Sequence, residues 1–187
     1  WKDTNDNGTR DKLVDGQRVE AVFDLMIFSD SPQFRQIAEI IRENCRRIGL
    51  EVQITPTKWA LMLQKIRKKE FDATILGWAL NWKSDPFQIW HGSQADLPES
   101  SNAIGYSNPE LDKLIDTLRT TMDPDKQTAL YHKIHKIIYD DQPYTFLFME
   151  KRTAGRHARL DNINFYKIRP CVDSREWSAA EPRVLPQ

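Results

Sequence analysis

The hydrophobic and polar residues of the chain change their period several times, and these changes predict a regular succession of strands and helices. Residues 18–29 alternate and then become apolar, which is typical of a strand entering a core. Residues 32–48 carry apolar side chains at helical spacing. The pattern then becomes strand-like at 50–56, helical at 57–70 and strand-like at 71–76. This order predicts an α/β fold whose strands pair at least partly in parallel.

Residues with defined roles at helix ends mark where the first two helices start and stop. Ser31 followed by Pro32 is a favourable start, with serine as the N-cap and proline in the first helical position. Gly49 suits the position just after a last helical turn, and Thr57 can cap the next helix. These residues support two helices between the three strands.

The following part of the chain is predicted to be mainly helical as far as residue 141. Residues 87–90 suit a short helix, and a long polar loop follows them. Asn108 and Asp123 each precede a proline and an apolar stripe at helical spacing, so each is predicted to cap a helix. Residues 144–149 are strongly strand-like, and 163–168 are a weaker candidate for a strand.

The composition is that of an ordinary globular protein with balanced charge. The 187 residues are 40% hydrophobic and 29% charged, which suffices for one sizeable core. Lysine and arginine total 27, as do aspartate and glutamate, so the charge does not indicate nucleic-acid binding. No apolar run approaches the ~18 residues of a membrane-spanning helix. The chain begins at Trp1 without a methionine, as expected for an excised domain or a processed product.

Residues 71–91 combine a strand pattern with a high density of tryptophan. Gly77 ends the apolar run, and three tryptophans follow within thirteen residues among polar side chains. In α/β sheets ligands bind beyond the carboxyl ends of the strands, so this loop is the candidate ligand-binding segment. The alternative is that the tryptophans are core residues, since tryptophan is usually well buried. The loop residues expected to contact a ligand are Trp78, Asn81, Trp82 and Asp85.

Oxygen-bearing side chains alternate near the start of the chain in the manner of a calcium loop. Such oxygens can wrap a hard cation when a glycine, here Gly8, allows the sharp turn. Val14 occupies the position at which a bidentate glutamate closes a calcium loop, however. A solvated turn without metal explains the same residues, and both interpretations stay open. The calcium ligands under the first interpretation are Asp3, Asn5, Asn7 and Asp11.

A second metal hypothesis concerns His132 and His135, which lie three residues apart on one face of a predicted helix. With Asp140 or Asp141 they could hold a metal ion. A solvated helix face beside an isoleucine stripe accounts better for this segment. The chain contains neither a G-x-S-x-G nor an H-E-x-x-H sequence. The sequence therefore predicts a protein that is not an enzyme, with a metal-dependent hydrolase as the remote alternative.

Four sequence motifs occur in the same order as in one known family. They are FDATILGWALNWKSDP, SNAIGYSNPELDKLI, DPDKQTALYHKIHKIIYDDQPYTFLF and ARLDNI. Together they resemble the extracellular solute-binding proteins of peptide ABC transporters, the oligopeptide- and dipeptide-binding family called family 5. The turn DTNDNGTRDKLVDG is also similar to this family, so the resemblance extends over nearly the whole chain.

The resemblance implies that residues 1–187 form a single lobe of a longer two-lobe protein. This C-terminal lobe would have a type II periplasmic-binding-protein-like α/β fold, a mixed sheet flanked by helices, with 178–187 as a tail. A peptide or related solute would bind between it and the missing N-terminal lobe, and the closed protein would dock on a membrane ABC permease. The implied location is periplasmic or extracellular, with lipid anchoring of the full-length protein as an option, and no cofactor is implied. A sensing or interaction module with the same fold is the alternative function.

The resemblance also implies roles for individual residues. In the family, an aspartate three residues after the tryptophan often pairs with the α-ammonium group of a peptide, and Asn81 stands there in this chain. Asn81 supplies no charge, so Asp85 becomes the candidate for the acidic role. Asn102 and Tyr106 are expected to line the cleft, although asparagine in a loop is also typical of a turn. Longer peptides, sugars and metal chelates therefore stay open as ligands.

Overall fold

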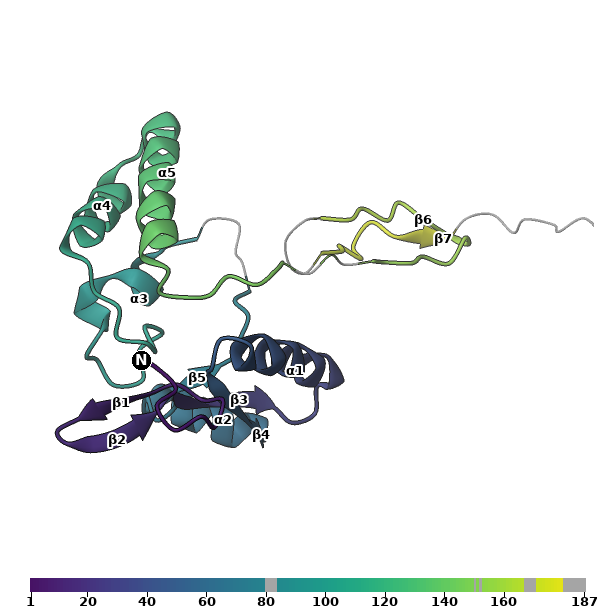
Figure 1. Cartoon of the computed structure of the whole chain (residues 1–187). Helices are drawn as coiled ribbons and strands as arrows, with labels where there is room; N and C mark the ends of the chain where they lie inside the picture. The colour runs from purple at the N-terminus through teal and green to yellow at the C-terminus, as the bar shows by residue number, and fades with distance from the viewer. Residues whose placement is uncertain (80–83, 150, 152, 167–170, 180–187) are drawn as a thin grey trace, which may run out of the picture. The chain divides into compact units, whose positions relative to one another are not determined.

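The computed structural model describes residues 1–79, 84–149, 151, 153–166 and 171–179, which form two compact units (Figure 1). The first unit comprises Trp1–Gly77 and Phe87–Lys113, and the second comprises Trp78–Pro86 and Leu114–Gln187. The structure defines each unit by itself, so the single lobe over 1–187 stays a prediction. No helix of the described residues is both long enough and apolar enough to cross a membrane.

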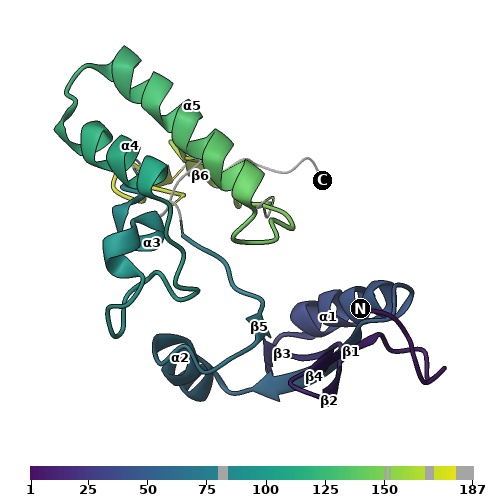
Figure 2. The ribbon, with the colours of Figure 1, turned by 60° about the vertical axis from the view of Figure 1, so that its left-hand side comes forward.

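A parallel three-stranded sheet forms the centre of the first unit. Its strands are β3 (Val22–Phe28), β4 (Glu51–Thr57) and β5 (Ala73–Thr74), in the order β4-β3-β5. The helices α1 (Pro32–Arg46) and α2 (Trp59–Arg67) connect these strands in turn (Figure 2). β3 pairs with β4 along its whole length and with β5 at two positions. The predicted α/β class and the alternation of strands and helices are confirmed.

Both faces of the central strand are buried. On one face, Leu25 and Ile27 pack with Ala38 of α1 and Val52 of β4, all at most 4% exposed. On the other face, Met26 is 2% exposed. Partly buried residues of the α1 stripe complete the cluster: Phe34, Ile37, Ile41 and Cys45. A strand with a neighbour on each side and apolar cover on both faces reads as a continuous apolar run, as the sequence does here.

The ends of α1 follow the prediction, whereas the start of α2 does not. The Ser31 hydroxyl accepts a hydrogen bond from the Phe34 backbone N–H at 3.3 Å, and Gly49 has a φ of 76° just after the helix. The prediction that Thr57 caps α2 is wrong, because Thr57 is the last residue of β4 and its carbonyl accepts from Ser29 in the sheet. Lys58 is the N-cap instead, without a side-chain hydrogen bond.

An antiparallel hairpin precedes the sheet. β1 (Asp11–Val14) pairs with β2 (Gln17–Glu20) around Asp15 and Gly16, whose φ values are 50° and 80°. Two positive φ values in a two-residue loop are typical of the type I′ turn, and Asp-Gly is one of its preferred sequences. The prediction of one continuous strand over 18–29 is therefore wrong: β2 belongs to the hairpin, and Ala21 separates it from β3.

A short helix and a turn of 3₁₀ helix follow in the first unit. α3 (Phe87–Trp90) confirms the predicted short helix, and η1 (Gly92–Gln94) begins the polar loop. The Asn108 side chain accepts from the backbone N–H groups of Glu110 and Leu111 at 3.0 and 3.2 Å, so it caps α4 (Pro109–Thr120) as predicted.

Two helices lie side by side in the second unit, as Figures 1 and 2 both show. They are the later part of α4 and α5 (Pro124–Asp141), and α5 is capped by Asp123 as predicted. Their inward stripes are confirmed by burial of Ile115, Leu118, Ile134 and Ile138, each at most 4% exposed. Further along the chain, β6 (Leu160–Asp161) pairs with β7 (Ser178–Ala179) in antiparallel fashion.

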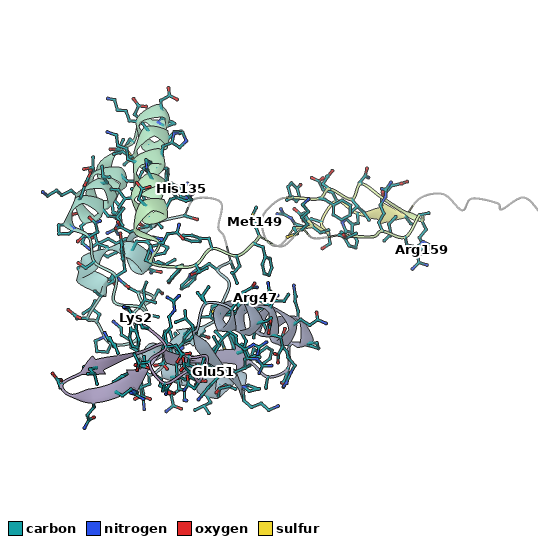
Figure 3. All side chains as sticks on the ribbon, in the orientation of Figure 1. Lys2, Arg47, Glu51, His135, Met149 and Arg159 are labelled. Atoms are coloured by element: carbon teal, nitrogen blue, oxygen red, sulfur yellow. The ribbon has the colours of Figure 1, made fainter. Side chains whose placement is uncertain are left out.

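The strand predicted at 144–149 is wrong, because this segment forms no strand. A strand needs a neighbouring strand for its backbone hydrogen bonds, and none of the described strands pairs with it. The side chains of residues 146–149 are exposed, from 47% at Leu147 to 82% at Met149 (Figure 3). The candidate strand at 163–168 is reduced to one bridge between Phe165 and Val172, and 167–168 lie outside the described residues. Of the predicted tail, 178–179 form β7 and 180–187 also lie outside.

Candidate functional site

The candidate ligand-binding segment, residues 78–86, follows β5 and belongs to the second unit. Its described residues are Trp78, Ala79 and Ser84 to Pro86. The predicted ligand contacts Asn81 and Trp82 lie outside the described residues. The geometry of the segment therefore comes from its two ends.

At the first end, Trp78 is half exposed and bonded to Tyr144. The exposed fraction of Trp78 is 51%, so a large part of the indole remains accessible, unlike a core tryptophan. Its side chain hydrogen-bonds the phenol of Tyr144. Burial raises the pKa of Tyr144, and the bond from Trp78 opposes part of that rise.

At the second end, Asp85 pairs with a cation on α4. The Arg119 Nε atom lies 3.2 Å from a carboxylate oxygen of Asp85, and both side chains are about half exposed. The Tyr131 hydroxyl of α5 donates a hydrogen bond of 2.7 Å to the Ser84 carbonyl oxygen. Burial, and secondly the negative charge of Asp85, raise the pKa of Tyr131. Two helices thus hold the residues that end the candidate segment.

Asn102 and Tyr106 belong to the first unit, where they form one tight loop. The Asn102 side chain is 0% exposed; it donates to the Tyr106 carbonyl at 2.7 Å and accepts from the Tyr106 N–H at 2.9 Å. It also donates to the His91 carbonyl at 3.4 Å. The Tyr106 ring meets Trp90 edge to face, with centroids 5.9 Å apart. Asn102 therefore has the turn-forming role, while Tyr106 is only partly buried.

The predicted calcium loop is held together by its own hydrogen bonds. Asp3 accepts from the backbone N–H groups of Asn7 and Gly8 at 3.2 and 2.9 Å, and the oxygen of Asn5 accepts from Asn7 at 3.4 Å. Asp11 is 3% exposed, and hydrogen bonds from the backbone and then the hydroxyl of Thr4 lower its pKa. The turn thus has internal partners for these oxygens, and calcium binding stays a prediction.

A polar depression of about 280 Å³ lies beside this loop (Figure 3 labels Arg47 and Glu51 in its lining). It is lined by Asn7, Gly8, Thr9, Arg46, Arg47 and Glu51. Both arginines pair with Glu43, at 3.3 and 3.7 Å, and are about 70% exposed. The depression is thus lined by polar, solvated groups.

His132 and His135 are exposed on α5 (Figure 3 labels His135). Next to them, Lys136 pairs with Asp140 at 2.7 Å. Within the described part of the chain, no three or more His, Cys, Asp or Glu side chains are grouped so that they could hold a metal ion. The helix face carrying the two histidines is solvated, in agreement with the simpler of the two sequence interpretations.

Three residues that the sequence did not single out contact the candidate segment: Arg119, Tyr131 and Tyr144. They lie far from it in the chain, for example 47 residues between Ser84 and Tyr131. Of the six predicted ligand contacts, Trp78 and Asp85 lie in the second unit and Asn102 and Tyr106 in the first.

Comparisons of sequence and of structure both find similarity to bacterial solute-binding proteins. The family described as "Bacterial extracellular solute-binding proteins, family 5 Middle" matches residues 1–96. The oligopeptide-binding protein AppA of Bacillus subtilis (strain 168) is 29% identical over 183 residues, which is 97% of this chain and 33% of AppA. The oligopeptide-binding protein OppA of the same organism is 25% identical over 129 residues, 68% of this chain and 23% of OppA.

The structure of AppA in complex with a nonapeptide has a similar fold. It superposes with a TM-score of 0.75 at 30% identity and covers 97% of this chain. The chain spans 35% of that structure, and so about a third of the length of this relative.

Proposed function

We propose a peptide-binding role in an ABC importer for this chain, because it belongs to the bacterial extracellular solute-binding proteins of family 5. The family is one of binding proteins. The observation that carries the proposal is the similarity to AppA over 97% of the chain, in sequence and in fold. AppA is an oligopeptide-binding protein whose structure holds a nonapeptide, so an oligopeptide is the proposed ligand.

The proposed mechanism is closure around the ligand. This chain would supply one side of the site, and the part of the protein that it does not span would supply the other. A ligand shifts the protein towards the closed form only through its higher affinity for that form. The closed form would then dock on a membrane permease, in the periplasm or outside the cell. A lipid anchor in the full-length protein is part of the same proposal.

The candidate segment would meet the ligand through its aromatic and polar side chains. The exposed indole of Trp78 offers an apolar surface that can cover the ligand as water leaves. Asn81, Trp82 and Asp85 are proposed as further ligand contacts. The contact of Tyr106 with a ligand stays a prediction, in which Asn102 would act by holding the Tyr106 loop in shape.

Native mass spectrometry of the full-length protein, purified gently from its source, tests the proposal. We expect additional masses that fragment into amino-acid sequences. A matched sample that has been unfolded, washed and refolded should lack these masses and regain them on addition of peptides. Co-purification of a non-peptide solute, with no uptake of peptides by the stripped protein, would contradict the proposal.

A further inference from the structure

The exposed turn near the start of the chain contains an asparagine that is followed by glycine. Asn7 and Gly8 form the only such pair among the 187 residues. Both residues are exposed, and both line the polar depression that also includes Arg46 and Arg47. Glycine has no side chain to shield its backbone nitrogen from the residue before it. The pair therefore has the solvent access and the open backbone that a reaction between the Gly8 nitrogen and the Asn7 side chain requires.

This reaction is deamidation through a cyclic imide, which makes asparagine a thermolabile residue. The Gly8 N–H gives its proton to a base, and the nitrogen forms a bond to Asn7 Cγ. The bond from Cγ to Nδ2 then breaks, and Nδ2 takes up a proton and leaves as ammonia. Water opens the ring at one of its two carbonyl carbons and yields aspartate or isoaspartate. Loss of the Gly8 proton is thus the first requirement of the reaction.

Asp3 holds that proton in the structure. The Gly8 N–H donates a hydrogen bond to Asp3 Oδ2 at 2.9 Å, and the Asn7 N–H donates to Oδ1 of the same carboxylate at 3.2 Å. Hydrogen bonds to an ionised acceptor are roughly twice as strong as neutral ones. The negative charge of Asp3 also disfavours the amide anion that has to form on Gly8. The carboxylate therefore opposes the reaction in two ways.

The side chain of Asn7 is held as well. Its Nδ2 atom donates to Glu20 Oε1 at 2.7 Å, and its Oδ1 atom accepts from the Thr9 N–H at 2.8 Å. These two bonds, one at each end of the amide, fix its orientation. Loss of Nδ2 as ammonia would break the bond to Glu20 and place a new carboxylate next to the Glu20 carboxylate. Because like charges disfavour each other, the product would be less stable in this turn than asparagine.

We propose that Asn7 is a deamidation site, and that the Asp3 carboxylate keeps the reaction slow in the folded protein by holding the Gly8 N–H. Asp3 is then a positioning and protecting residue of the turn, and this role requires no metal ion. The proposal is independent of the peptide-binding function proposed above, because every group in it belongs to the first unit.

Timed incubation of the full-length protein in mildly alkaline buffer tests the proposal. Peptide mapping by mass spectrometry measures the aspartate and isoaspartate formed at position 7, and the same protein unfolded in guanidinium chloride gives the unprotected rate. We expect deamidation of the folded protein to be at least about tenfold slower, which corresponds to a barrier higher by about 1.4 kcal/mol. Asp3→Ala removes the acceptor and the charge, and should raise the folded-state rate by about fivefold or more.

Two further variants separate the hydrogen bond from the charge of the turn. Asp3→Asn keeps an acceptor oxygen without the charge, so its rate should lie between those of the natural protein and Asp3→Ala. Asp6→Asn is the matched control, because it removes one charge from the same turn and leaves the bonds of Asp3 in place. Asparagine tolerates the left-handed backbone of residue 6, whose φ is 57°. Thermal melting of each variant shows whether it is folded.

Each outcome decides for or against the protection. Slow deamidation of the natural protein, accelerated in folded Asp3→Ala and unchanged in Asp6→Asn, supports the proposal. Equal rates for the folded and the unfolded natural protein overturn it, because the turn then protects nothing. It is also overturned if folded Asp3→Ala keeps the natural rate, or if Asp6→Asn accelerates the reaction as much as Asp3→Ala does.

Discussion

Asn102→Ala tests how the loop carrying Tyr106 is held. The Asn102 side chain is fully buried, and it bonds both the N–H and the carbonyl of Tyr106, at 2.9 and 2.7 Å. Alanine lacks the side-chain amide, so both backbone groups of Tyr106 lose their partner and a space is left at the centre of the loop. The variant therefore tests the side chain whose hydrogen bonds close the loop.

The expected cost follows from the two short bonds. Each contributes about 1 kcal/mol, and a backbone group left without a partner costs about 1–3 kcal/mol. A loss of about 2–4 kcal/mol in the free energy of opening the loop is therefore expected. The lower value corresponds to about a 30-fold rise in the population of the open loop.

Hydrogen exchange, measured by mass spectrometry or by NMR for the Tyr106 amide, reports on this opening of the loop. The exchange of residues 103–107 should accelerate by at least about tenfold in Asn102→Ala, while β3 keeps its protection. Asn164→Ala is a matched control, because the Asn164 amide makes an exposed bond to Glu176 at 3.3 Å and should cost less than about 0.5 kcal/mol. Unchanged exchange of the Tyr106 amide in the folded Asn102→Ala protein would refute the reasoning.

Other predictions concern a helix cap, a titration and the ligand site. Asp123→Ala removes the side-chain acceptor at the start of α5 and should lower stability to urea by about 1 kcal/mol; an unchanged midpoint would contradict the cap. Hydrogen bonds from Arg175 hold the pKa of Asp173 at about 2, below its ordinary 3.8. Because the folded-state pKa is depressed, the stabilising contribution of this pair is present above pH 3.8 and is lost as the pH falls through about 2. Carbon NMR should show that midpoint, and Arg175→Met should return it towards 3.8; equal midpoints would contradict the pairing. Trp78→Ala in the full-length protein should weaken peptide binding by a few kcal/mol at most, whereas Trp78→Phe, which keeps a ring, should weaken it less. Calorimetric affinities equal to that of the natural protein would remove Trp78 from the site.

Features of the fold that depend on neighbouring residues could be predicted from the sequence. The strand and helix periods define β3, α1, β4 and α2, and Ser31, Asn108 and Asp123 cap their helices through bonds to residues two or three positions away. The Asp15-Gly16 pair also carried the signal of a two-residue hairpin turn. The apolar alternation of the adjoining strands obscured that signal, so two strands were predicted as one.

Features that depend on distant partners could not be predicted in this way. The run at 144–149 has strand propensity, but propensity does not supply a neighbouring strand. The candidate segment was found from its place after a strand, and Asp85 from its charge. Asp85 pairs with Arg119, and this ion pair depends on the packing of α4, which no local pattern encodes.

Calorimetric titration of the stripped full-length protein with oligopeptides tests the central claim most directly. The account predicts saturable binding of one peptide per protein, with a negative change in heat capacity from apolar burial around the ligand. It also predicts that the 187 residues alone bind the same peptides much more weakly, because one side of the proposed site is missing. Absence of binding by the full-length protein across peptides of two to nine residues would contradict the account.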